Sequence, residues 1–294
     1  GGDNYEVMSL LTRAQVEAGQ GGTMEIAFAA VGVRVRLALL QGDSPAAREL
    51  LASFEQSVRE NRAVQLLPNI QALRCRLALY EGDMDMVERW MKTAPDEDRE
   101  FCVLERYRYL TKVRCYLANG EYTKAQALLE KLRYYAEQTG RPYVRMETGL
   151  LSAITKERVG GPWQEELATV LKEAERYRFL RLITEEGAAV WPLFQREKKA
   201  LQEAGTLNKD WLRRLLAEAE EVARRYPLYL KKRAAVAADF KGVALTILRL
   251  QADGLSVNRI AQRLDLKPDN VKYHIKENYR KLNVDNKTDA LLAA

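Results

Sequence analysis

The sequence is poor in the residues that build catalytic and metal centres. It contains one histidine, His274, and three cysteines, Cys75, Cys102 and Cys115, which lack CxxC or metal-ligand spacing. A histidine pair and a multi-histidine metal site are therefore excluded, and we expect no catalytic residues, no metal ligands and no enzyme activity. The cysteines lie in apolar helical patterns, so we expect them to be reduced thiols in a cytosolic protein.

Long apolar runs and phosphate-binding loops are also missing. No apolar stretch approaches the roughly 20 residues that span a bilayer, so we expect no membrane partner. The motif GxxxxGK[ST] is absent, and the glycine-containing run 19–22 lacks the Lys and the Ser or Thr that bind phosphate and magnesium. The chain opens with Gly1-Gly2 rather than Met, so we expect it to be part of a longer protein. It should hold no cofactor itself, and ATP enters only if a nucleotide-binding domain precedes it.

The sequence contains enough apolar residues for a sizeable core, and its charged residues are unevenly distributed. Hydrophobic residues make up 47% of the 294 residues, a length that allows two domains. The chain has 47 Lys and Arg against 41 Asp and Glu, a net charge of +6. The segment from Phe240 onward holds ten basic and six acidic residues, so most of this excess lies near the C-terminus.

The first half of the chain contains an internal repeat. Three stretches resemble one another: RLALLQGDSPAARELL from Arg36, RLALYEGDMDMVERWM from Arg76 and RCYLANGEYTKAQALL from Arg114. Their glycines are spaced 40 and 38 residues apart, and a degenerate fourth follows after another 40: Gly42, Gly82, Gly120 and Gly160. This period is typical of stacked helix pairs, which share one continuous core because a single pair cannot bury its apolar face.

The turns of the repeat carry their own signals. Each glycine is expected to end one helix in the left-handed conformation, and Asp43, Asp83 or the Ser44-Pro45 pair to start the next. The pattern resembles a tetratricopeptide repeat array, although its period exceeds that family's 34 residues by about five. Further helices are predicted at 163–182, 188–204 and 211–225, with no strand-like alternation between them.

Three short helices are predicted after residue 244. Leu245, Leu248 and Ala252 share one face of the first, which Gly254 ends. Ser256 can cap the second helix. The inward residues of the second helix are Ile260, Ala261 and Leu264. Pro268 and Asp269 begin the third.

The third of these helices has two different faces. The core-facing stripe lies within about 80° on a helical wheel and consists of Val271, Ile275, Tyr279 and Leu282. The opposite side carries Lys272, Tyr273, Lys276 and Arg280. A helix with cations at i, i+4 and i+8 opposite an apolar face has the shape and charge to enter a DNA major groove. A solvated basic surface helix shows the same pattern, so the pattern alone leaves both interpretations open.

The sequence of this segment resembles the LuxR-type helix-turn-helix family. GLSVNRIAQRL and NVKYHIKENYRKLNVDNKTDA follow that family's pattern GLSNKEIA, TVKxH and YRKLxVxNRTEA, over residues 245–290. The resemblance implies that the helix carrying VKxH is the recognition helix, with base contacts from Lys272, Tyr273 and Lys276. It implies contacts to the DNA backbone from Asn270, Lys281, Arg280, Lys267 and Ser256. It also implies a last helix, beginning near Asn286, that dimerises.

Some positions depart from the family pattern. The family usually opens its first helix with LTxRE, where this chain has FKGVA at 240–244, so we expect that helix to begin late or to fray. Arg259 replaces the usual Glu of the second helix, and Lys267 replaces the usual Ser before the third. His274 has no nucleophile or second ligand beside it, so we assign it a packing or capping role.

Together these features predict an all-α fold. A tetratricopeptide-like helical-hairpin superhelix is expected over residues 1–227, a linker over 228–239 and a small LuxR-type helix-turn-helix domain over 240–294. This order resembles the large MalT-like ATP-dependent regulators. The resemblance implies a cytoplasmic bacterial transcriptional regulator that binds double-stranded DNA as a dimer or higher oligomer and whose repeats sense an inducer or partner protein.

Two matters stay open at the level of sequence. The alternative function is a protein-interaction scaffold, in which the repeats bind a partner and the C-terminal domain docks onto protein rather than DNA. Ligand-binding residues are not predicted. The tyrosine-rich stretch 107–143 could suit a ligand, but packing between stacked helices is the favoured interpretation, and the concave surface of the array is the place to look.

Overall fold

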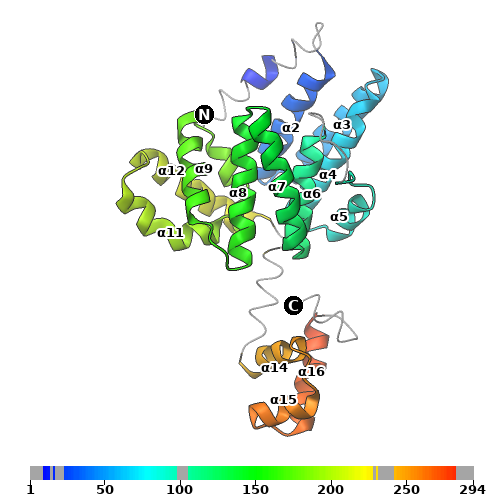
Figure 1. Cartoon of the computed structure of the whole chain (residues 1–294). Helices are drawn as coiled ribbons and strands as arrows, with labels where there is room; N and C mark the ends of the chain where they lie inside the picture. The colour runs from blue at the N-terminus through cyan, green and yellow to red at the C-terminus, as the bar shows by residue number, and fades with distance from the viewer. Residues whose placement is uncertain are drawn as a thin grey trace. The chain divides into compact units, whose positions relative to one another are not determined.

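A computed structural model describes residues 9–13, 16, 23–97, 105–227, 230 and 242–282 of the chain. The chain divides into two compact units, Gly1–Tyr229 and Leu230–Ala294, and each is considered by itself. Every regular element in these described ranges is helical, which confirms the predicted all-α class (Figure 1). The predicted linker at 228–239 lies, apart from Leu230, outside the described residues.

The first unit is an array of helix pairs. They are α2 (Met24–Leu40) with α3 (Ser44–Glu60), α4 (Leu67–Glu81) with α5 (Met84–Met91), α6 (Arg106–Asn119) with α7 (Tyr122–Gln138), and α8 (Pro142–Arg158) with α9 (Gln164–Tyr177). A short 3-10 turn, η1 (Val64–Leu66), precedes α4. Helix α6 packs on α4 and α8 as well as on its own partner, so the first helices of the pairs form an inner layer (Figure 1). The predicted stacking of helix pairs is confirmed.

The turns between paired helices have the predicted chemistry. The four landmark glycines have φ between +71° and +87°, the left-handed region that side chains disfavour: Gly42, Gly82, Gly120 and Gly160. Asp43 and Asp83 then cap the following helices, because the Oδ1 atom of each accepts a hydrogen bond of 3.0 Å from a backbone N–H three residues ahead. In the first two of these turns a left-handed glycine is therefore followed directly by a helix cap, whereas Glu121 after Gly120 makes no such side-chain bond.

Two of the later predicted helices are wrong in their boundaries. The helix predicted at 163–182 breaks at Arg178, which has φ 57°, and the chain continues as α10 (Leu180–Thr184). The helix predicted at 188–204 begins as a 3-10 turn, η2 (Gly187–Ala189), before α11 (Trp191–Ala204). Apolar residues continue through both breaks, so hydrophobic periodicity cannot reveal a helix break caused by one isolated left-handed residue.

The last helix of the unit begins slightly earlier than predicted. Helix α12 (Lys209–Arg225) starts two residues before Trp211, because the Asn208 side chain caps it by accepting hydrogen bonds from the N–H groups of Asp210 and Trp211. It ends before Tyr226, as predicted. No helix in the described part of the chain combines the length and the apolar composition that a membrane crossing requires.

The C-terminal end of the first unit folds back onto the start of the array. Helix α12 packs on α10 and η2. Val222 and Tyr226 belong to the same buried cluster as Leu39 of α2 and Leu77 of α4. Arg225 Nη1 also donates a hydrogen bond of 3.4 Å to the carbonyl of Leu40. The segment from α10 to α12 therefore covers the inner layer rather than extending the stack.

A cluster of buried and partly buried charged side chains lies between the inner layer and this covering segment. It contains Arg36 of α2, Arg76 of α4 and Arg114 of α6, with Glu147 of α8 and the Glu185-Glu186 pair after α10. Arg36 Nη1 lies 3.0 Å from Glu185 Oε2, and Arg114 Nη2 lies 2.8 Å from Glu147 Oε1. Arg114 also pairs with Glu186. Each of the three arginines stands six residues before a landmark glycine, so the repeat brings equivalent positions together.

The cysteines are consistent with the predicted thiols where they are described. Cys75 on α4 and Cys115 on α6 are buried and free, with their Sγ atoms 3.6 Å apart. The hydrogen bond between the two thiols, together with burial, raises the pKa of Cys75 far above its ordinary range, which keeps it protonated. Cys102 lies outside the described residues.

The described part of the second unit contains three short helices. Its helices are α14 (Val243–Ala252), α15 (Val257–Leu264) and α16 (Pro268–Leu282), and its core consists of Ile247, Leu250, Ile260, Ala261 and Val271. The face predicted for the first helix is wrong in part, because Ala252 is exposed and Leu245 only half-buried. Gln251 is buried instead, and its Nε2 donates to the Tyr279 hydroxyl at 3.3 Å. The buried face of α14 therefore includes Gln251 and differs from the face that hydrophobic periodicity predicts.

Candidate nucleic-acid interface

Helices α15 and α16 form a helix-turn-helix with a short connection. Ser256 caps α15, its hydroxyl accepting a hydrogen bond of 3.5 Å from the Arg259 N–H. Asp265 ends that helix with φ 52°, and the N–H of Leu266 donates to the Ala261 carbonyl at 2.9 Å. Residues 265–267 then lead directly into Pro268, the first residue of α16. These local bonds fix the direction in which α16 leaves the turn.

The inner side of α16 is held by two apolar and two polar residues. Val271 is fully buried, and Ile275 packs against the same core. Asn278, which the sequence reasoning missed, is 1% exposed, and its Nδ2 donates to the Ala244 carbonyl at 3.0 Å. Asn278 stands seven residues after Val271, so heptad spacing along the core-facing stripe was the available signal. With the Tyr279 bond to Gln251, these contacts attach α16 to α14 and fix which face of α16 is exposed.

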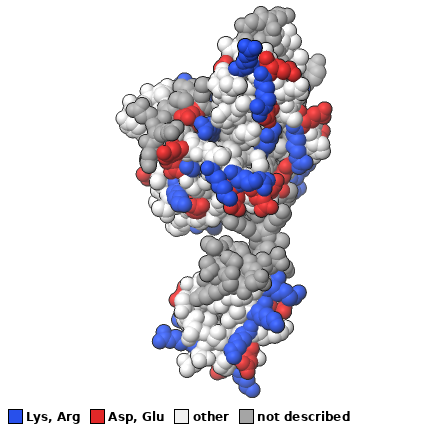
Figure 2. Space-filling view, turned by 90° about the vertical axis from the view of Figure 1, so that its right-hand side faces the viewer, with Lys and Arg blue, Asp and Glu red and all other residues white. Residues whose placement is uncertain are grey.

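The opposite face of α16 is exposed and basic. Lys272, Tyr273, Lys276 and Arg280 all lie on it, as the helical wheel predicted. Tyr273 is 63% exposed, so its ring projects from this face. Figure 2 shows Lys and Arg side chains gathered along one side of this unit, with a few acidic side chains between them. A protruding aromatic among cations suits contact with base edges and phosphates.

Two of these cations are paired with neighbouring carboxylates on the same helix. Lys272 Nζ lies 3.2 Å from Asp269 Oδ1, and Arg280 Nη2 lies 2.9 Å from Glu277 Oε2. Exposed pairs of this kind contribute about 0–1 kcal/mol, so phosphate groups can replace the carboxylates at small cost. Lys276 makes no ion pair with any residue that the structure describes.

The residues predicted to touch the DNA backbone are placed less completely. Asn270, Lys267 and Ser256 are exposed at the turn and at the start of the helices that it joins. The side chain of Lys281 and the predicted dimerisation helix near Asn286 lie outside the described residues. The assignment of all these residues to DNA contacts stays a prediction.

The single histidine has a local role in this unit. His274 is half-buried on α16, and its ring lies 5.7 Å from that of Tyr273 in an edge-on arrangement. This contact fits the predicted packing role.

Comparison with known proteins identifies two matching families. The family described as "MalT-like TPR region" matches residues 11–200, and the family described as "Bacterial regulatory proteins, luxR family" matches residues 245–294. A curated protein, the HTH-type transcriptional regulator MalT of Vibrio campbellii, is 24% identical over 231 residues. The aligned part covers 72% of the chain and 25% of that protein, so the chain spans about a quarter of the length of this relative. No solved structure matches the chain significantly.

Proposed function

The chain belongs to the MalT-like TPR family and carries a luxR-family helix-turn-helix domain, and on this premise we propose that it regulates transcription by binding DNA through α16. The observation that carries the proposal is the exposed face of α16, where Lys272, Tyr273 and Lys276 project from a helix fixed on its other side by a buried core. In this proposal the three side chains contact base edges in the major groove.

The remaining predicted contacts complete the proposed binding mode. Asn270, Lys267 and Ser256 at the turn, with Arg280 and Lys281 at the far end of α16, bind phosphates and set the register of the helix in the groove. The segment from about Asn286 dimerises, which presents two recognition helices to a two-fold site. The chain then acts as a DNA-binding protein and catalyses no reaction.

The proposal extends to the repeats and to the setting of the protein. The repeat unit senses an inducer or a partner protein, and the protein works in the cytoplasm. No cofactor binds to this chain, and ATP belongs to a preceding nucleotide-binding domain if the longer protein has one. The relative named above is described as a transcriptional regulator, which supports this assignment.

A salt titration of DNA binding tests the proposal directly. The whole chain is titrated with a mixed-sequence DNA duplex at several salt concentrations, and affinity should fall steeply as salt rises because counterions are released from the DNA. Lys272→Ala combined with Lys276→Ala should weaken binding and make it less dependent on salt, because two cations are lost from the face that meets the DNA.

A matched control removes two lysines elsewhere. Lys198→Ala combined with Lys199→Ala changes two exposed cations on α11 and the same net charge, and it should leave the salt dependence unchanged. Unchanged affinity in the α16 double variant would mean that this face does not bind DNA. A chain without salt-dependent DNA affinity that still retains a protein partner in a pulldown would instead support the scaffold function.

A further inference from the structure

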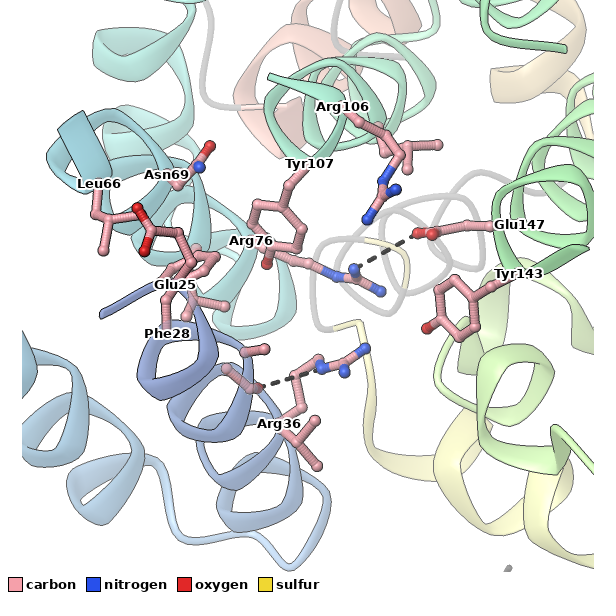
Figure 3. Close-up of a pocket in the computed structure, with 15 residues that line it drawn as sticks. Glu25, Phe28, Arg36, Leu66, Asn69, Arg76, Arg106, Tyr107, Tyr143 and Glu147 are labelled. Atoms are coloured by element: carbon pink, nitrogen blue, oxygen red, sulfur yellow. Dashed lines mark hydrogen bonds and ion pairs between the residues drawn. The ribbon is translucent and has the colours of Figure 1, made fainter. Parts of the chain in front are cut away.

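The inner layer of the repeat unit contains a cavity that none of the proposed DNA contacts uses. It has a volume of about 370 Å³ and is lined by residues of α2, α4, α6 and α8. Small-molecule sites commonly measure about 300–1,000 Å³ and combine apolar walls with a few polar groups. This cavity has both, since Phe28 and Leu73 lie in the same lining as Arg76 and Tyr107 (Figure 3).

Arg76 is the central polar group of this lining. Its side chain is only 5% exposed, yet its nearest carboxylate oxygens, on Glu147, Glu185 and Glu186, lie 3.6–3.7 Å away, beyond hydrogen-bond distance. These three carboxylates are already bound more closely by Arg36 and Arg114. Arg76 Nε is buried without any hydrogen-bond partner in the described part of the chain. The guanidinium is therefore neutralised from a distance while its donors stay unused.

Two further buried atoms on the cavity lining lack partners. They are Asn69 Oδ1 and the Tyr107 hydroxyl, for which the described residues provide no hydrogen bond. Burial of an unpaired polar group costs about 1–3 kcal/mol, so most buried polar atoms in proteins are paired. Three unpaired polar groups on one cavity indicate that their partner is a molecule that enters it.

The charge of the lining selects the chemistry of that molecule. The guanidiniums of Arg36, Arg76 and Arg106 point toward the same space, with Tyr143 beside it (Figure 3). Two carboxylates, on Glu25 and Glu147, also belong to the lining, so its cations outnumber its anions by one. Arg106 forms no ion pair with any described residue. Arg114 and Arg76 keep Glu147 ionised, because they lower its pKa despite the opposing effect of burial. The unpaired groups of the lining are therefore mainly N–H donors, which suit a ligand with acceptor oxygens. Carboxylate and phosphate groups supply two such oxygens to one guanidinium.

We propose that this cavity is the inducer site of the repeat unit and that it binds a small organic anion. The carboxylate or phosphate of the ligand lies between Arg76 and Arg106 and accepts from the Tyr107 hydroxyl, while its apolar body lies against Phe28 and Leu73. The proposal rests on the sensing role given to the repeats above, and it adds the location of the site and the class of ligand.

Matched probes test the charge requirement on the whole chain. Benzoate and phenyl phosphate represent the two anionic groups with an apolar body, inorganic phosphate has no such body, and benzamide and benzyl alcohol are neutral probes of similar shape. Melting temperature and calorimetric titration should show binding of benzoate or phenyl phosphate at millimolar concentrations, weaker binding of inorganic phosphate, and none of the neutral probes. Equal binding of charged and neutral probes, or no binding of any anion, overturns the proposal.

Two variants assign the binding to this cavity. Tyr107→Phe removes a hydroxyl that has no partner, so the unliganded protein should keep its melting temperature while the Kd of the anion rises about fivefold. Arg106→Gln should raise the Kd about tenfold or more. Arg145→Gln, which removes an equal charge from an exposed ion pair with Glu173, is the control and should leave the Kd unchanged. Anion binding that survives both cavity variants overturns the assignment. The assignment is also overturned if Tyr107→Phe lowers the stability of the unliganded protein by as much as it lowers the free energy of anion binding.

The failure of this inference is distinct from that of the proposed function. Anion binding is measured without DNA, and the salt titration of DNA binding is measured without anion. A chain that binds DNA but no anion retains its function and loses this site. A chain that binds the anion but not DNA retains the site and loses the proposed regulator role.

Discussion

Arg36, Arg76 and Arg114 place three positive charges inside the repeat unit, where charges are costly unless they are paired. Glu147, Glu185 and Glu186 supply an equal number of negative charges, so the cluster is neutral as a whole. Burial alone would raise the pKa of Glu147, but Arg114 and Arg76 together hold that pKa below its ordinary value of 4.5. The carboxylate is therefore ionised in the folded protein at neutral pH and contributes to stability there.

Glu147→Gln tests this contribution and its pH dependence. At neutral pH the variant should lose about 3–5 kcal/mol of unfolding free energy, because it leaves guanidinium charge buried without compensation. Since the folded pKa of Glu147 is lowered, its contribution is fully present above pH 4.5 and is lost as pH falls through the folded pKa. Urea unfolding at several pH values should therefore show the two proteins converging in acid.

The exposed Glu137 on α7 provides the comparison for that experiment. Glu137→Gln should change the unfolding free energy by no more than about 0.5 kcal/mol, as is usual for a surface position. If the two variants lost the same stability, or if the difference from the unmodified chain stayed constant as pH fell, the ionised role of Glu147 would be wrong.

The distance between packed helices of the array differs from place to place. Two glycines inside helices, Gly149 and Gly32, show the difference. A Cβ added at Gly149 of α8 would lie 2.8 Å from Val170 Cγ2 of α9. A Cβ added at Gly32 of α2 would lie 3.9 Å from Leu73 Cδ2 of α4, an ordinary contact. Alanine is favoured over glycine inside a helix by about 1 kcal/mol, so packing decides the sign at each position.

The two alanine variants should therefore move stability in opposite directions. Gly32→Ala should raise the unfolding free energy by up to about 1 kcal/mol. Gly149→Ala should lower it, because overpacking costs about 1–3 kcal/mol and exceeds the helix preference. Thermal unfolding of both variants measures the difference, and a stabilised Gly149→Ala would show that α8 and α9 can separate without cost.

The elements of this protein could be predicted well where a local signal sets them. Gly42 and Asp43 form a left-handed end and a cap within two residues, so the sequence contains the whole cause of that turn. Arg178 adopts the same left-handed conformation without being glycine, and the sequence holds no sign of it. Gln251 is buried by its contact with another helix, and a polar residue outside the apolar stripe gives no sequence signal of that burial.

On the scale of the whole molecule, the exposed face of α16 was predictable and the inner cavity was not. The face follows from the helical period within one element, which places Lys272, Tyr273 and Lys276 together. The cavity depends on residues of four helices, α2, α4, α6 and α8, that are far apart in the sequence. Arg36, Arg76 and Arg114 were visible as the first residues of three repeats, but only the stacking of those repeats brings them to one place.

The covering segment also carries the point at which the chain leaves the repeat unit. The Ala188 N–H donates a hydrogen bond of 2.9 Å to the carbonyl of Tyr226. The described part of this unit ends one residue later, at Pro227. Tyr80 donates to the Glu185 carbonyl, and its ring lies 5.8 Å from that of Tyr226. Two of the carboxylates that balance the three guanidiniums, on Glu185 and Glu186, therefore lie next to the turn that is hydrogen-bonded to the exit of the unit.

If the cavity binds the proposed anion, the anion site and the exit of the unit are parts of one thermodynamic cycle. An anion that drew Arg76 away from Glu185 and Glu186 would change the free energy of the turn that holds Tyr226. If that change alters DNA affinity by some factor, linkage requires DNA to alter anion affinity by the same factor. Titrating phenyl phosphate into the chain with and without bound DNA should give two Kd values whose ratio equals the shift in DNA affinity, and unequal ratios would break the cycle.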